Sequence, residues 1–192
     1  MGGRHAPLIL ASTSPQRRAI LEQLRVPFEV VAPSYREADD LPLLPADLVR
    51  RHALGKARSA RRPGRLVLGV DTTVVLDGQV YGKPAGREEA RETLRALSGR
   101  THVVVSGLCL LGEGLELVEH AETLVTFRPL SPLALETYLA SGEWEGRAGA
   151  YAIQGLGGRL VERIEGDYLN VVGLPGALLV TLLERHAPEL LA

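Results

Sequence analysis

The chain has little of several residue types, and each shortage excludes a class of protein. Of its 192 residues only one is cysteine, one is methionine and one is tryptophan, and aromatic residues make up 4%. The lone Cys109 cannot form an internal disulfide, and its apolar neighbours predict a small core residue in a reducing compartment. No apolar run approaches the roughly 20 residues that span a bilayer, and no charged-then-apolar leader precedes the first apolar run. We therefore expect a cytoplasmic protein without a membrane segment.

An excess of charge of one sign is also absent, because the formal net charge is −1. This balance disfavours a general nucleic-acid binder, and the shortage of aromatics disfavours base stacking. Residues 50–65 nevertheless contain seven Lys or Arg residues and no acid. We interpret most of them as solvated helix faces and expect no nucleic-acid partner. The alternative, a nucleic-acid-binding module, predicts steeply salt-dependent RNA affinity without triphosphate turnover.

Strand-like apolar runs alternate with helical patterns along the chain, and no linker divides it. The length suits a single domain over residues 1–192. Strands are predicted at about 8–11, 28–31, 66–76, 79–81, 101–111, 116–127, 150–153 and 159–164. Helices are predicted at about 15–24, 45–60, 87–97, 132–141 and 178–185. The two hairpins, at Asp77-Gly78 and across residues 112–114, favour a mixed α/β sheet over a purely parallel one.

The segment 8–18 predicts a strand that leads into an anion site. Ser14 is a good N-cap and Pro15 a good first helical residue. The first turn of a helix already carries roughly half a positive charge, so Arg17 and Arg18 are explained best by a bound anion such as a phosphate chain. The alternative is an ordinary capped helix start with two solvated arginines.

Two further segments contain charged residues in informative places. Asp71 interrupts a strand otherwise fit for burial, so it is either a paired structural residue or a site residue. Alternation puts Gly69, Asp71 and Thr73 on one face, where small neighbours would leave room for a ligand. Lys83, between Gly82 and Pro84, is either a point charge for a phosphate or an exposed turn lysine.

The histidines and the single cysteine do not form a zinc cluster by spacing. If a metal binds, carboxylates and substrate phosphates would hold it, which suits magnesium or manganese.

Six segments, taken in order along the chain, together resemble the Maf family of nucleoside triphosphate pyrophosphatases. They are 10–17 (LASTSPQR), 69–72 (GVDT), 82–84 (GKP), 98–103 (SGRTHV), 148–155 (AGAYAIQG) and 170–175 (NVVGLP). The segment at 148–155 is similar to the branch that hydrolyses dTTP and UTP.

The resemblance implies an elongated α/β protein in which a twisted mixed sheet, flanked by helices, forms two lobes with a central cleft. It implies hydrolysis of a nucleoside triphosphate to the monophosphate and pyrophosphate, with a divalent cation, magnesium or manganese, as cofactor. The expected substrates are dTTP and UTP, with modified pyrimidine nucleotides as a further class. A homodimer is left open.

The same resemblance assigns roles to residues. Asp71 would be the catalytic proton acceptor or a metal ligand, and Glu37 is a weaker candidate for a metal contact. The residues expected to bind substrate are Ser12, Ser14, Gln16, Arg17, Lys56, Thr72, Lys83 and Gln154. Among these, Arg17 and Lys83 would neutralise the triphosphate, and the two serines would donate hydrogen bonds to it.

Base choice is expected from Gln16, Thr72 and Gln154, because the Gln154 amide could read the O4 and N3 edge of uracil or thymine. Gln16 stands where the dTTP/UTP branch commonly has arginine, so 7-methyl-GTP or another base remains the alternative within the family. A second alternative is a nucleotide-binding regulator of cell division without turnover.

Overall fold

The computed structural model describes residues 6–37 and 42–191. The chain divides into two compact units. The first comprises Met1–Asp71, Ser106–Ala121 and Gly173–Ala192, and the second comprises Thr72–Val105 and Glu122–Val172. None of the described helices is long and apolar enough to cross a bilayer.

Strands and helices alternate along the chain, as the apolar patterning predicts. The strands are β1 (Leu8–Leu10), β2 (Phe28–Val30), β3 (Val67–Leu76), β4 (Gln79–Tyr81), β5 (Thr101–Gly112), β6 (Leu115–Phe127) and β7 (Val161–Glu165). The α-helices are α1 (Pro15–Gln23), α2 (Pro45–Ser59), α3 (Arg87–Leu97), α4 (Pro132–Ala140), α5 (Tyr168–Val172) and α6 (Gly176–His186). Short 3-10 turns are η1 (Ala148–Ala150), η2 (Leu156–Leu160) and η3 (Pro188–Leu190).

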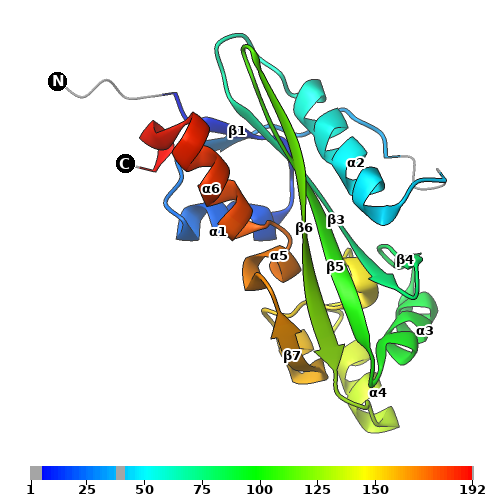
Figure 1. Ribbon diagram of the computed structural model, residues 1–192. Coiled ribbons are helices and arrows are strands. Elements are labelled where there is room, and N and C mark those ends of the chain that lie inside the picture. Colours follow the sequence, from blue (N-terminus) through cyan, green and yellow to red (C-terminus); the bar gives the residue numbers. More distant parts are fainter. Residues whose placement is uncertain (1–5, 38–41, 192) are drawn as a thin grey trace. The chain divides into compact units, whose positions relative to one another are not determined.

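The described strands form one seven-stranded mixed sheet, which confirms the expected fold class (Figure 1). The strand order is β2-β1-β3-β5-β6-β7, with β4 paired to β3. Strand β1 pairs with β2 and β3 in parallel, whereas β4 pairs with β3 and β7 pairs with β6 in antiparallel fashion. Asp77 and Gly78 have φ angles of 51° and 79°, so the β3–β4 hairpin has the tight turn that this dipeptide predicts.

In the first unit, α2 lies directly against the sheet, because two glycines remove the side chains that would keep it away. A Cβ on Gly69 of β3 would lie 2.0 Å from the Ala53 carbonyl oxygen, and one on Gly107 of β5 would lie 2.2 Å from that of Val49. In Figure 1, α2 lies on one side of β3 and β5, and α1 and α6 lie on the other. The expectation that Gly69 leaves room for a ligand is therefore wrong, because helix backbone fills that space.

Cys109 lies in the core beneath α2, fully buried with Ala53, Ala57 and Ile9. Burial raises the pKa of its thiol to about 12, so it is inert at neutral pH. The interpretation of Cys109 as a small core residue is confirmed.

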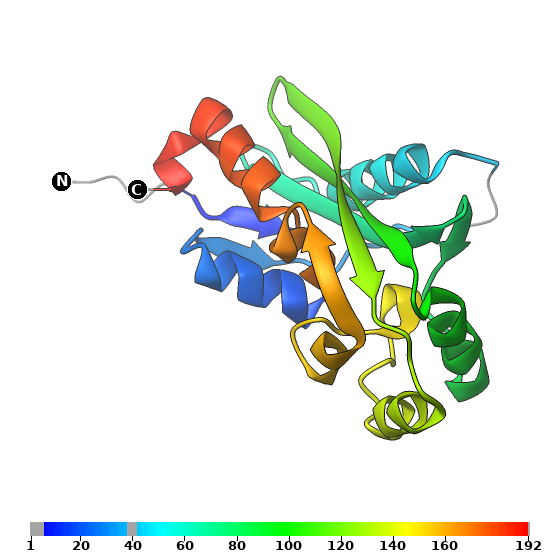
Figure 2. The same ribbon diagram turned by 60° about the horizontal axis from the view of Figure 1, so that its bottom comes forward.

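The second unit has a core of its own, in which Leu94, Phe127 and Tyr138 are buried together. Figure 2 shows α3 and α4 beside each other in this unit, and the two helices are in contact. Trp144 packs against the same core, and its indole N–H donates to the Leu139 carbonyl oxygen at 3.1 Å. The tryptophan is thus part of the packing of this unit.

The strand predicted at 150–153 is wrong. This segment leaves η1 and enters a turn, because Gly149 and Ala150 both have positive φ angles, 68° and 58°. A strand needs extended backbone, so the left-handed Ala150 and the turn that begins at Ile153 exclude one here. The following strand, β7, begins at Val161 rather than at residue 159, and α5 was not predicted.

Candidate functional site

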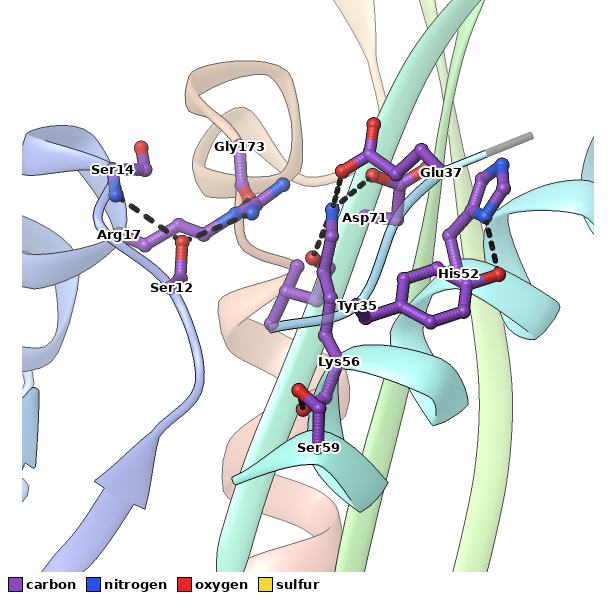
Figure 3. Close-up of polar contacts among 11 residues, drawn as sticks. Ser12, Ser14, Arg17, Tyr35, Glu37, His52, Lys56, Ser59, Asp71 and Gly173 are labelled. Carbon is purple, nitrogen blue, oxygen red and sulfur yellow. Dashed lines mark hydrogen bonds and ion pairs between the residues drawn. The ribbon is translucent and has the colours of Figure 1, made fainter. Parts of the chain in front are cut away.

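The first part of the candidate site is the turn between β1 and α1, which presents two hydroxyls and a guanidinium (Figure 3). The buried Ser12 accepts hydrogen bonds through Oγ from the Ser14 amide and from Arg17 Nη1, both at 3.2 Å. Arg17 Nε donates to the Gly173 carbonyl oxygen at 2.9 Å. Arg17 is therefore held by two partners, within the first turn of α1.

Ser14 is the residue before α1, as predicted, but its side chain does not cap the helix. Its hydroxyl instead donates to Gln16 Oε1 at 3.1 Å. The first-turn amides of α1 are consequently not engaged by the Ser14 side chain, and the helix N-terminus keeps its capacity to bind an anion.

The pKa of the Arg17 guanidinium is affected by burial and by two carboxylates of the same unit. Burial lowers its pKa below the usual value, and the negative charges of Asp71 and Glu37 act in the opposite direction. Buried positive charge is stabilised by anions, so this arginine favours a negatively charged ligand.

The second part of the candidate site is an ion-pair centre around Lys56 of α2. Lys56 Nζ lies 2.6 Å from Asp71 Oδ1 and 2.6 Å from Glu37 Oε1. The lysine side chain is 8% exposed, that of Asp71 is 13% exposed and that of Glu37 is 36% exposed. Lys56 Nζ also lies 3.4 Å from the Val70 carbonyl oxygen. Asp71 is thus a paired residue, and its pairing places three charged groups together (Figure 3).

The close approach of α2 at Gly69 makes this centre possible, and it can be tested with Gly69→Ala. The added methyl would meet the Ala53 carbonyl oxygen, which is backbone and cannot rotate away. We expect the free energy of unfolding, measured by urea titration, to fall by about 1–3 kcal/mol.

Gly112→Ala is the matched control for this variant. Its Cβ would meet the tip of the Leu66 side chain at 3.3 Å and Leu115 Cβ at an ordinary contact distance of 3.8 Å, so stability should change little. Equal stability of the Gly69 and Gly112 variants would contradict the packing argument.

Sequence reasoning missed Tyr35 and His52, which hold the segment that carries Glu37 against α2. Tyr35 Oη lies 3.1 Å from Nδ1 of the buried His52, one turn before Lys56 on α2. The Tyr35 ring covers Gly55, where a Cβ would lie 2.3 Å from ring carbon Cε2. The signal available in the sequence was Gly55 itself, since a glycine inside a helix often marks a close approach.

The centre fits a divalent cation held partly by substrate. Asp71 and Glu37 both reach the position of one cationic group, and Mg²⁺ is commonly bound by one or two carboxylates plus phosphate oxygens and water. Within residues 6–37 and 42–191, no group of three or more His, Cys, Asp or Glu side chains is arranged to hold a metal. The side chains therefore suit a metal that arrives with a phosphate ligand, not a closed protein cage.

The remaining expected site residues, Thr72, Lys83 and Gln154, belong to the second unit. Thr72 follows Asp71 directly in β3. Lys83 and Gln154 are exposed, and within the described part of the chain their side chains make no hydrogen bond or ion pair. Both are thus available for a ligand, whereas Lys56, Arg17 and Ser12 are already held in place.

The basic run at 50–65 does not form a free positive surface. Arg58 pairs with Glu116, and Arg62 and Arg65 both reach Glu29. These partners neutralise several of the charges, so the structure supports a solvated, salt-bridged face more than a nucleic-acid interface.

Comparison with known proteins agrees with the motif pattern. The sequence profile described as "Maf-like protein" matches residues 7–186. A protein of Symbiobacterium thermophilum named dTTP/UTP pyrophosphatase is 51% identical over 170 residues, which cover 88% of each chain. Proteins of the same name from Nitratidesulfovibrio vulgaris and Alcanivorax borkumensis are each 49% identical, over 94% and 92% of this chain and 88% and 94% of their own. A match of this extent and similarity shows that the chain belongs to the Maf family.

Proposed function

We propose that this chain is a nucleoside triphosphate pyrophosphatase that hydrolyses dTTP and UTP to the monophosphate and pyrophosphate. We also propose that residues 1–192 act as one catalytic domain. The names of its relatives support the reaction and the substrates. The observation in the chain itself that carries the proposal is the charged centre of Lys56, Asp71 and Glu37, together with the held guanidinium of Arg17.

The reaction is displacement at the α-phosphorus by water, with pyrophosphate as leaving group. Asp71 is the proposed acceptor of the proton that the water loses, because it is a carboxylate held by Lys56 in a largely buried position. Lys56 orients Asp71, since its ammonium donates a hydrogen bond to Asp71 Oδ1 at 2.6 Å.

The triphosphate would be bound by groups that still have hydrogen-bond donors or positive charge to offer a ligand. Ser12 Oγ accepts two hydrogen bonds, so its own hydroxyl hydrogen remains for a phosphate oxygen. Arg17 and the exposed Lys83 supply positive charge, and the first-turn amides of α1 add donors. Ser14 would have to turn its hydroxyl away from Gln16 to donate in the same way.

A magnesium or manganese ion is the proposed cofactor, with Asp71 and Glu37 as the residues that would hold it. When bound, it would withdraw negative charge from the phosphates and make a coordinated water more acidic. Lys56 Nζ lies 2.6 Å from each of these carboxylates. For the ion to bind, the ammonium would have to move away from them or share them with the ion.

Base recognition is assigned to Gln154, with Gln16 and Thr72 as further contributors. An amide can donate and accept at once, which matches the carbonyl and N–H edge of uracil and thymine. The exposed position of Gln154 and the absence of another partner for its side chain within the described residues support this role.

The proposal is tested by measuring pyrophosphate release from dTTP, UTP, CTP, GTP, 7-methyl-GTP and ATP, each with magnesium or manganese. We expect dTTP and UTP to be hydrolysed with the highest kcat/KM, and chelation of the metal to abolish release. Preference for 7-methyl-GTP or CTP would overturn the substrate assignment. Binding without turnover of any triphosphate would favour the regulator.

Two further points go with this proposal. The inert, buried Cys109 suits a reducing compartment, which supports a cytoplasmic location. A homodimer, which the family resemblance leaves open, can be distinguished from a monomer by light scattering on the same preparation.

A further inference from the structure

A fully buried histidine in the second unit is bonded to the loop that precedes Gln154. His102 of β5 is 0% exposed, and its Nε2 lies 2.9 Å from the hydroxyl oxygen of Tyr151, which is 6% exposed. Both rings meet Phe127 edge to face, with centroids 5.0 and 4.9 Å from it. His102 and Tyr151 are thereby fixed in position as well as hydrogen-bonded.

This hydrogen bond is the link between β5 and the loop, because the other ring nitrogen, Nδ1, is buried and has no hydrogen-bond partner in the described part of the chain. Burial lowers the pKa of His102 to about 4, so the ring is neutral at the pH of the reaction.

A second buried side chain holds the same loop from α4. Tyr138, which is 3% exposed, accepts a hydrogen bond at its hydroxyl oxygen from the Ala152 amide, at 3.0 Å. Beyond Gln154, Glu143 Oε2 accepts from the Leu156 amide at 2.7 Å. Side chains outside the loop thus bind the backbone or side chains on both sides of Gln154.

The loop between these attachments is conformationally demanding. Ala150 has a φ angle of 58°, which is uncommon for a residue with a side chain. The preceding Gly149 has no room for a side chain, since a Cβ would lie 2.7 Å from Val74 Cγ2. Backbone in sparsely populated regions persists only where surrounding contacts impose it, and such segments concentrate at functional sites.

We propose that His102 and Tyr138 are positioning residues that hold the 151–155 turn so that Gln154 presents its amide to the pyrimidine base. This inference rests on the proposed function and extends it. Neither residue touches the substrate: His102 acts through the Tyr151 hydroxyl and Tyr138 acts through the Ala152 amide. Gly149 also donates from its amide to the Gly82 carbonyl oxygen at 3.2 Å, so the same loop is tied to the segment that carries Lys83.

Two single-hydroxyl deletions test the proposal with little change of packing. Tyr151→Phe removes the hydrogen-bond partner of His102, and Tyr138→Phe removes the acceptor for the Ala152 amide. Tyr168→Phe is the matched control, because Tyr168 is exposed and lies outside these contacts. Gln154→Ala reports the effect of losing the base contact itself. For each variant we would measure kcat and KM for dTTP, UTP and CTP, and the thermal midpoint of unfolding.

We expect Tyr151→Phe and Tyr138→Phe to lower the preference for dTTP over CTP by roughly threefold to tenfold, the size expected for a mispositioned hydrogen bond. The change should appear as a higher KM for dTTP with kcat retained, since a base contact is made equally in the ground state and the transition state. A role in folding alone would lower the thermal midpoint without changing the ratio between bases.

The outcomes distinguish the positioning proposal from the proposed function on which it rests. If Gln154→Ala loses the preference but both tyrosine variants keep it, the positioning role is wrong and the base assignment stands. If Gln154→Ala keeps the preference, the base assignment fails, and the positioning proposal fails with it. A wild-type protein without turnover would overturn the proposed function itself.

Discussion

Replacement of Asp71 by asparagine is expected to lower pyrophosphate release by at least about 10²-fold while the fold is retained. Asparagine has nearly the shape of aspartate, and its carbonyl oxygen can still accept the hydrogen bond that Lys56 Nζ donates to Asp71 Oδ1 at 2.6 Å. It cannot accept the proton of the attacking water, and it carries no charge for a metal. The loss should therefore appear in kcat, measured with dTTP at saturating metal.

The matched control is Asp77→Asn in the turn between β3 and β4. Asp77 is exposed, has a φ angle of 51° and pairs with Arg100, and asparagine tolerates the left-handed conformation well. Both variants should show wild-type circular dichroism. Turnover of the Asp71 variant within a few-fold of the wild-type rate would remove Asp71 from the mechanism.

A second large effect is expected on stability in acid, and it comes from His102. Burial holds the pKa of this histidine at about 4 in the folded protein, against about 6.5 in an unfolded chain. Below pH 6.5 the unfolded state binds a proton that the folded state does not, so stability falls as the pH falls. A difference of this size is equivalent to about 3 kcal/mol, lost between pH 6.5 and pH 4.

This effect is measured as the free energy of unfolding by urea at several pH values. Between pH 6.5 and 5, where most carboxylates stay ionised, the slope should be clearly positive in the wild type and flatter in His102→Gln. The side chain of glutamine offers both a donor and an acceptor to the Tyr151 hydroxyl and does not titrate. His186→Gln, at an exposed position near the end of α6, should keep the wild-type slope. Equal slopes in all three proteins would show that His102 does not govern acid stability.

Local patterns predicted much of the secondary structure, because the physical signals for these elements lie within a few residues. Helix α3 occupies residues 87–97 as its apolar spacing and Gly99 indicate, and Ser131 caps α4 through the hydrogen bond from the Ala134 amide. The β3–β4 hairpin follows from Asp77-Gly78 alone. Each of these features depends on backbone geometry that one short segment imposes on itself.

The prediction failed at residues 150–153 for the opposite reason. The short apolar run there suggested a strand, but the left-handed Ala150 is imposed by contacts from elsewhere in the second unit. The Ala152 amide bonds to Tyr138 on α4 and Tyr151 bonds to His102 on β5. Tertiary contacts therefore overrode a local preference for extended structure.

For the candidate site, too, some features follow from the sequence and others only from the tertiary structure. The sequence alone determined that an acid interrupts a buried strand at Asp71, that hydroxyls and arginines open α1, and that the motifs are those of the Maf family. Only the tertiary structure decided that Asp71 is paired with Lys56 and Glu37, that Gly69 seats a helix and not a ligand, and that Tyr35 and His52 support Glu37. The physical reason is that an ion pair or a close approach joins residues distant along the chain, and its geometry exists only after α2 has packed on the sheet.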